Sequence, residues 1–225
     1  MHFDHNNQEI QEISVEKETA EHKILHTAIT LLGMEGLKRF TIRRVAERSG
    51  VNVAAINYYF RSKDNLIKEA LQHYSQLTQK VFAVLQDESL TPFDRLHTFL
   101  TRFAMHLVTY PGFMKSILIQ AMNKEDIDPR AKESMIRGRE ALFHLLQTAG
   151  VPSGVTPEDA DAQLRMKIFQ MMAGIIYPVM WGTYTKELYL IDFENPTVRE
   201  RYINMLLHNL FPELGGAQSR PTIEG

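Results

Sequence analysis

Apolar residues recur every three or four positions along most of this chain, which is the spacing of helices with one buried face. The pattern predicts a first helix that ends near residues 33–36, a long helix from Ser62 to about residue 85, and another from residue 91 to Tyr110. Further helices are predicted at about 113–123, at about 130–149, over about 25 residues from Thr156, and from Asn195 onward. No stretch shows sustained strand alternation, so we predict an all-α protein.

Residues that favour helix ends divide this pattern into elements. Thr41 and Asn52 are N-cap types, because their side chains can accept a hydrogen bond from a backbone amide of the first turn. Ser49-Gly50 ends the helix between them, since glycine adopts the left-handed cap conformation without steric cost. Segment 41–63 is therefore predicted to form two short helices joined by a tight turn.

The second short helix has two unlike faces. At about 100° per residue, Ile56, Tyr59 and Phe60 share the inner face, and small or polar side chains occupy the outer one. Such a face suits insertion into a major groove, so the pattern indicates a helix-turn-helix that binds double-stranded DNA. The base-reading candidates are Asn52, Val53, Ala54, Asn57 and Tyr58. Asparagine can bond adenine in a bidentate manner; the alternative for Asn57 is a bond to phosphate or solvent.

This region resembles the N-terminal signature of TetR/AcrR-type transcriptional regulators. The resemblance runs without gaps from about Lys23 to Leu71 and rests on Gly36, Thr41-Ile42, Val45-Ala46, Ser49-Gly50-Val51, Ile56, Tyr59-Phe60, Ser62-Lys63 and Leu66. Asn57 departs from it, because the family usually has a tyrosine there, and this departure bears on the choice of operator. The resemblance implies a three-helix DNA-binding head on a larger helical ligand-binding and dimerisation body, with a homodimer formed through the last two helices.

Charge is distributed unevenly along the chain. The net charge is −2, yet residues 35–63 hold seven basic and two acidic residues, so the remainder carries −7. Screening confines electrostatics to roughly 8–10 Å at physiological salt, so the local excess is what DNA phosphates meet. The phosphate candidates are Thr41, Arg43, Arg44, Tyr59 and Lys63. The alternative for any single arginine is a solvated charged face.

Four regions are expected along the chain. These are a flexible tail at 1–18, the helix-turn-helix domain at 19–64, a helical regulatory and dimerisation domain at 65–214, and a second flexible tail at 215–225. Methionine and aromatic residues are frequent in the third region, where they most simply form core. The family resemblance also implies an inducer site for a small apolar or aromatic molecule. The candidates are Phe99, Phe103, His106, Met114, Phe143, Met166, Phe169, Gln170, Tyr177 and Trp181.

Several functions find no support in the sequence. The chain has no cysteine, which excludes disulfides and thiolate sites. Residues 1–12 lack the pattern of a signal peptide, and the most apolar stretch, residues 168–181, is shorter than the roughly 20 residues of a membrane span. We find no catalytic motif, expect no cofactor or metal, and interpret His22 and His26 as exposed histidines.

We therefore predict a cytoplasmic, homodimeric DNA-binding repressor that is released by a small-molecule inducer. The alternative is a helix-turn-helix protein whose body docks a protein partner and has no inducer. An enzyme on a helical scaffold is the least supported reading.

Overall fold

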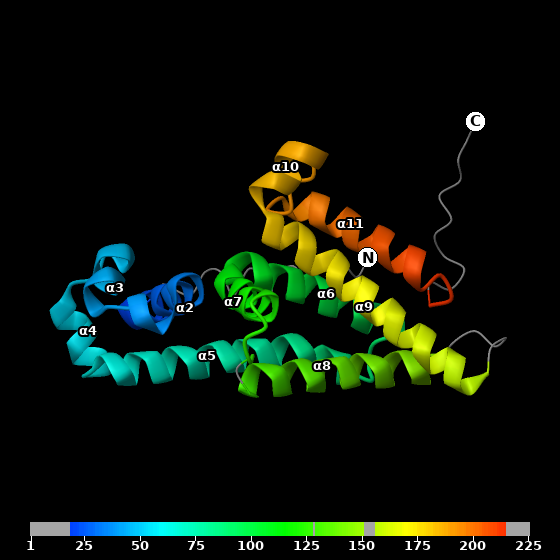
Figure 1. Ribbon diagram of the computed structural model, residues 1–225, viewed down its shortest axis with the longest axis horizontal. Helices are drawn as coiled ribbons and strands as arrows, with labels where there is room; N and C mark the ends of the chain where they lie inside the picture. Colours follow the sequence, from blue (N-terminus) through cyan, green and yellow to red (C-terminus); the bar gives the residue numbers. More distant parts are fainter. Residues whose placement is uncertain (1–18, 128, 151–155, 215–225) are drawn as a thin grey trace. The chain divides into compact units, whose positions relative to one another are not determined.

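The computed structural model describes residues 19–127, 129–150 and 156–214 of the 225-residue chain (Figure 1). Within these ranges the regular elements are all helical, which confirms the predicted all-α class. The elements are α2 (Ala20–Arg39), α3 (Ile42–Ser49), α4 (Val53–Phe60), α5 (Lys63–Ala83), the 3₁₀ helix η1 (Val84–Gln86), α6 (Pro92–Thr109), α7 (Pro111–Met122), α8 (Pro129–Thr148), α9 (Pro157–Trp181), α10 (Thr183–Tyr189) and α11 (Pro196–Leu210). The tails predicted at 1–18 and 215–225 lie outside the described residues.

The helices begin where short polar side chains cap them. The hydroxyls of Thr41, Thr91 and Thr156 each accept a hydrogen bond from the backbone amide three residues ahead, at 3.3, 3.1 and 3.3 Å. Asn52 and Asn195 accept from the amides of their own first turns at 2.7 and 2.9 Å. Each bond satisfies an amide that has no partner inside its helix.

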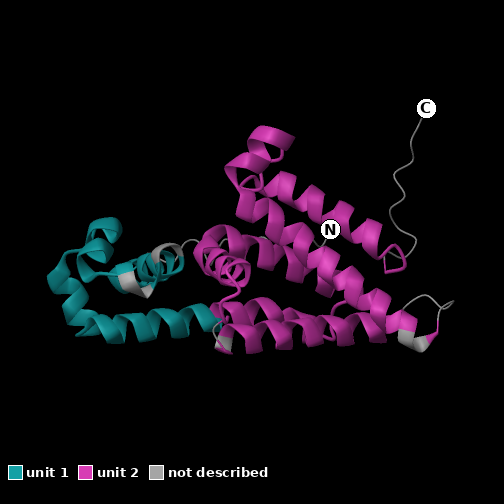
Figure 2. Cartoon of the chain, in the orientation of Figure 1, with its two compact units in different colours: residues 1–76 teal, residues 77–225 magenta. Residues whose placement is uncertain are grey.

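The chain divides into two compact units, residues 1–76 (unit 1) and 77–225 (unit 2), shown in Figure 2. The division falls within α5, whereas the sequence places a domain boundary between residues 64 and 65. The first half of α5 belongs to unit 1 because it contributes Leu66 and Ala70, both 0% exposed, to the buried residues there.

Unit 1 is built around a small apolar core. The buried side chains Ile24, Ile29, Val45, Ile56 and Phe60 come from α2, α3 and α4. The chain changes direction within α2 at a residue with φ 70° and ψ 171°, a conformation that favours glycine, and Gly36 occupies it. This break lies at the predicted end of the first helix, although helical structure resumes and continues to Arg39.

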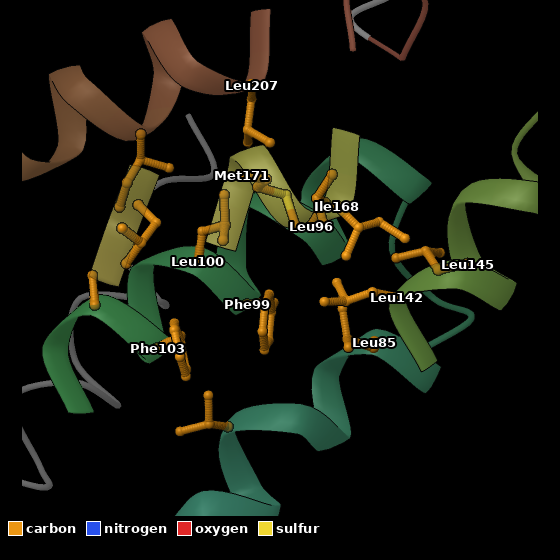
Figure 3. Packing of buried hydrophobic residues seen from close by; sticks show 14 of the residues in the cluster. Leu85, Leu96, Phe99, Leu100, Phe103, Leu142, Leu145, Ile168, Met171 and Leu207 are labelled. Atoms are coloured by element: carbon orange, nitrogen blue, oxygen red, sulfur yellow. The ribbon is translucent and has the colours of Figure 1, made fainter. Parts of the chain in front are cut away.

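Unit 2 has a larger core, with α6 at its centre. Figure 3 shows Phe99, Leu100 and Phe103 of α6 facing buried side chains of the neighbouring helices, among them Met171 of α9. The Phe99 and Phe103 rings stack with their centroids 5.5 Å apart. None of the helices within the described ranges is long and apolar enough to cross a membrane.

One helix of unit 2 was not predicted from the sequence. The seven-residue α10 lies between α9 and α11 and is too short to show helical periodicity. Thr185 anchors it, since this buried side chain donates a hydrogen bond to the carbonyl of Pro178 at 3.1 Å.

Candidate DNA-binding face and regulatory surfaces

Helix α4 presents the face that the sequence predicts for base reading. Ile56 and Phe60 are 0% and 1% exposed and hold the helix to unit 1, whereas Asn57 lies on its exposed side. Tyr58 is 80% exposed, and its ring meets that of Tyr59 edge-on at 5.3 Å. Val53 and Ala54 are also exposed. The predicted base-reading residues therefore share one side of a short, well-anchored helix.

Asn52 has a structural task at the start of this helix. Its side-chain oxygen already accepts the amide of Ala55 at 2.7 Å. Of its two polar side-chain atoms, the amide nitrogen is the one left to meet DNA. Asn57, which is exposed further along the helix, is better placed for bidentate recognition of a base.

The phosphate candidates are exposed as well. Thr41 caps α3, and Arg43 and Arg44 project from the first turn of that helix. Lys63 begins α5. A helix N-terminus carries partial positive charge and free amides, so the start of α3 is suited to bind an anion. Tyr59 is 42% exposed, whereas the sequence pattern places it on the inner face with Ile56 and Phe60.

The first turn of α5 contains a residue, Asn65, that the sequence analysis missed. Arg61 ends α4 at φ 62°, and the Asn65 side chain then donates to the carbonyl of Phe60 at 3.1 Å and to the carboxylate of Glu69 at 2.6 Å. Asn65 thereby ties the last turn of α4 to α5. The asparagine two residues after Lys63 was the available sequence signal, because it can bond backbone locally.

The ten candidates for an inducer site do not come together. Phe99, Phe103 and His106 are buried in the unit 2 core, and Met114 and Phe143 pack against that core. The α9 candidates are instead exposed: Met166 by 64%, Phe169 by 75%, Tyr177 by 47% and Trp181 by 42%, with Gln170 also exposed. The expectation that the α6 and α9 candidates share one pocket is therefore wrong for this structure. The reason is the helical repeat, which turns these α9 residues away from Ile168 and Met171.

His106 is the polar group of this set that lies inside the core. It is 8% exposed, and its Nε2 lies 3.1 Å from the hydroxyl of Thr78 on α5. Its ring meets that of Tyr110 edge-on at 5.4 Å. Burial lowers the pKa of His106 to about 4, so the imidazole is neutral at pH 7.

Two pockets of the structure differ greatly in volume. A pocket lined by Leu146, Leu164, Phe211 and neighbouring residues has a volume of about 10 Å³, which is room for one water molecule. A larger groove of about 410 Å³ lies on unit 1 and is lined mainly by polar side chains of α5. No group of three or more histidine, aspartate or glutamate side chains suited to a metal ion occurs in the part of the chain that the structure describes.

Helices α9 and α11 pack closely and leave an apolar outer surface. Tyr202 donates a hydrogen bond to the carbonyl of Gly174 at 2.9 Å, and a Cβ atom at that glycine would lie 3.2 Å from Leu206. On the outer side, Met205 of α11 is 54% exposed, and the stripe of Met166, Phe169 and Tyr177 runs along α9. We call these four residues the outer stripe.

Comparisons with known proteins agree with the helix-turn-helix. The family model for bacterial regulatory proteins of the tetR family matches residues 24–70. A Bacillus subtilis protein described as a probable HTH-type transcriptional regulator, YttP, is 30% identical over 131 residues, or 48% of this chain and 60% of that protein. Nucleoid occlusion factor SlmA of Haemophilus influenzae is 27% identical over 128 residues, or 55% of this chain and 58% of that protein.

A comparison of folds extends the similarity to the body. The crystal structure of a TetR-like transcriptional regulator from Rhodococcus sp. RHA1 superposes with a TM-score of 0.56, covering 90% of this chain and 100% of that one at 15% identity. At that identity the match concerns the fold alone. The chain spans about 60% of the length of the two curated relatives.

Proposed function

Because this chain belongs to the TetR family of bacterial transcriptional regulators, we propose that it is a homodimeric repressor released from its operator by a small molecule. The family is not enzymatic, so the function is one of binding. Each copy would place α4 in a major groove, and a two-fold dimer reads two half-sites of a palindrome. The main observation that supports DNA binding by α4 is that Asn57 and Tyr58 are exposed on a capped helix whose opposite side is buried.

The operator part of the proposal is tested by fluorescence anisotropy. DNA from immediately upstream of the protein's own gene is titrated against scrambled DNA at two salt concentrations. A preference of about 10³-fold or more for the upstream DNA over the scrambled DNA is in the range of sequence-specific DNA-binding proteins and would establish an operator. Equal binding with a steep salt dependence would place the operator elsewhere, and absence of binding at low salt would overturn the proposal.

The outer stripe supports the dimer part of the proposal. A monomer that exposes Phe169 by 75% and Met166 by 64% on one helix face offers apolar surface of the kind found at interfaces. We expect two copies to bury it against each other through α9 and α11. Sedimentation velocity of the wild type and of Phe169→Glu tests this. The wild type should sediment as a dimer and the variant as a monomer, and identical behaviour would contradict the assignment.

The inducer part rests on the core around His106. His106 and Thr78 form a polar pair that links α6 to α5, the helix that begins next to the DNA-binding helix α4. An apolar or aromatic molecule with a hydrogen-bonding group could take the place of one member of this pair. To weaken operator binding by about 100-fold, the ligand needs about 2.7 kcal/mol of preference for the non-binding state.

A ligand screen tests this part. Apolar and aromatic compounds are scored for a shift in thermal stability and for loss of operator binding, with Thr78→Val as the matched control. A compound that acts on the wild type and loses its effect in the variant supports the site. If no compound in the screen changes either quantity, the inducer part fails.

The exposed apolar surface of α7 and α8 favours a second candidate, a regulator controlled by a protein partner. These helices expose Ile119 by 57%, Met122 by 82% and Met135 by 47%, which gives a partner apolar surface to bind. In this case Ile119→Glu combined with Met122→Glu would abolish regulation in cells while operator binding in vitro stays unchanged. Both candidates act on DNA, so we place the protein in the cytoplasm.

A further inference from the structure

A strained residue stands in the turn where α4 passes into α5 (Figure 1). Arg61 has φ 62° and ψ −38°, and across it the amide of Ser62 donates to the carbonyl of Phe60 at 2.6 Å. These are the features of the γ-turn with positive φ, which is rare and strained for a residue other than glycine. Leu190, at φ 58° and ψ 27°, instead lies in the left-handed region where helices commonly end.

Hydrogen bonds hold this turn on both sides. The amide of Arg61 donates to the carbonyl of Asn57 at 2.9 Å, which ties the residue to the last turn of α4. Ser62 caps α5, because its hydroxyl accepts the amide of Asn65 at 3.1 Å. The Asn65 side chain donates to the carbonyl of Phe60 at 3.1 Å, so this carbonyl accepts two bonds. A strained conformation persists where its surroundings fix it in this way.

The side chain of Arg61 is exposed and takes no part in these bonds. Among the residues that the structure describes, none forms a hydrogen bond, ion pair or ring contact with its guanidinium. Glycine at this position would keep the turn without the strain. A charged side chain that bonds to nothing in the fold, at a position that favours glycine, indicates a bond to a partner molecule.

Arg61 lies between two groups of residues that we assign to DNA. Its amide bond to Asn57 places it one helical turn beyond this base-reading candidate, and the phosphate candidate Lys63 follows two residues later. In a helix-turn-helix, the N-terminal part of the recognition helix reaches the base edges. The chain that leaves the C-terminal end of α4 is therefore expected to meet the sugar-phosphate backbone beside the groove.

We propose that Arg61 binds a phosphate of the DNA backbone beside the groove that receives α4, and that the strained turn directs its side chain there. The inference rests on the proposed DNA-binding function. A guanidinium can donate two parallel N–H bonds to one phosphate, which an ammonium group cannot do. Because the turn is already fixed by hydrogen bonds, its backbone loses little conformational entropy when the contact forms.

Two substitutions separate the side chain of Arg61 from the strain of its backbone. Arg61→Ala and Arg61→Gly both remove the guanidinium, but only glycine relieves the turn. Both variants should lose affinity for duplex DNA equally, by at least about tenfold, and the slope of log affinity against log salt should fall by about 1 for each copy of the chain bound. The melting temperature of Arg61→Gly should lie about 2–4 °C above that of Arg61→Ala at equal protein concentration.

Fluorescence anisotropy with the full-length protein measures these affinities at four salt concentrations, and circular dichroism on heating gives the melting temperatures. Scrambled DNA is used beside DNA from upstream of the gene, because a phosphate contact acts on every sequence. Arg61→Lys should keep the salt slope and restore part of the affinity, since it retains the charge without the paired donors.

Lys68→Ala is the matched control. It also removes one positive charge from an exposed residue of unit 1, but Lys68 lies about 140° around α5 from Lys63. It should lower the affinity by less than about twofold, because exposed charges away from the contact are screened by salt.

The outcomes separate this inference from the proposed function. If both Arg61 variants bind DNA as tightly as the wild type or Lys68→Ala, the phosphate contact is overturned and DNA binding through α4 stays in place. A loss of affinity confined to the upstream DNA would also overturn it, since that result indicates a contact to a base. Equal melting temperatures of Arg61→Gly and Arg61→Ala would contradict the strained turn. A wild type that binds no DNA at low salt would overturn the proposed function together with this inference.

Discussion

The two units differ in how far they depart from the usual distribution of apolar and polar side chains. Among the described residues of unit 1, the buried side chains are all apolar, and the exposed large apolar ones are Val53, Tyr58 and Tyr59. In unit 2 the buried side chains include three polar ones: His106, Thr185 and Arg199. Unit 2 also exposes large apolar side chains on α6 to α11.

This difference fits the proposed homodimer, in which unit 2 supplies the interface. The three exceptions in unit 1 all lie on α4, the helix that we assign to the major groove. Unit 2 exposes apolar surface that a second copy would cover, and it buries polar groups at a cost in desolvation. Arg199 shows how that cost is offset, because its guanidinium donates to the carbonyl of Phe193 at 2.7 Å even though burial lowers its pKa.

The largest expected effect compares two positions on α4. Phe60→Ala should lower the free energy of unfolding by about 3–5 kcal/mol, because the ring is 1% exposed and its loss leaves a cavity. Tyr58→Ala should change it by less than about 0.5 kcal/mol and weaken DNA binding instead. Urea unfolding followed by circular dichroism measures the free energy of unfolding of each variant, and fluorescence anisotropy measures its affinity for DNA. Equal destabilisation by the two substitutions would contradict the division of α4 into a buried and a functional face.

Acid should destabilise unit 2 through His106. In the unfolded chain this histidine takes up a proton near pH 6.5, whereas in the folded chain its pKa is about 4. The unfolded state therefore binds more protons between these values, and stability falls as the pH drops from 6.5 to 4, by roughly 3 kcal/mol in total.

Urea midpoints at pH 7.5, 6 and 5 measure this loss, with His106→Gln as the matched control. The glutamine keeps a hydrogen-bonding group beside Thr78 but does not titrate. A pH dependence that is the same in both proteins would show that His106 is not its source.

Asn57→Ala should reduce specific binding at the operator by about 1–3 kcal/mol, the value of one bidentate contact to a base. Binding to scrambled DNA should change little, because Asn57 carries no charge. Competition titrations with operator and scrambled DNA give the ratio of the two affinities directly. If both affinities fall equally, Asn57 binds phosphate, which is the alternative that its sequence left open.

The smallest effect is expected for Lys63→Ala. Removing one phosphate contact should lower the affinity for every DNA sequence to a similar extent and reduce the slope of log affinity against log salt by about 1. Titrations at four salt concentrations with operator and scrambled DNA test this. A changed sequence preference at unchanged overall affinity would exclude the phosphate role.

Most of the fold could be predicted because local chemistry marks the helix boundaries. Thr41, Asn52 and Gly50 mark the limits of α3 and α4, and the threonine–proline and asparagine–proline pairs mark the starts of α6, α9 and α11. Helix α10 could not be predicted in this way. It depends on the contact between Thr185 and Pro178, which the sequence does not reveal.

The inducer candidates on α9 could not be assigned to a side of the helix from sequence. Phe169 and Met171 are both large and apolar, yet one is 75% exposed and the other 0%. A helix that packs against a core on one side and a partner on the other carries apolar residues on both sides. The spacing of apolar residues then does not show which side is buried in the single chain. Helix α4 posed no such difficulty, because its outer residues are small or polar.

The capped helix starts have a kinetic consequence. Each cap bond joins residues two or three positions apart, so a helix can begin at the correct residue before any distant part of the chain has arrived. Chains in which most early contacts are local search fewer conformations and fold faster than those that depend on distant pairings. During synthesis, unit 1 can thus acquire correctly bounded helices while the residues of α9 to α11 have yet to be made.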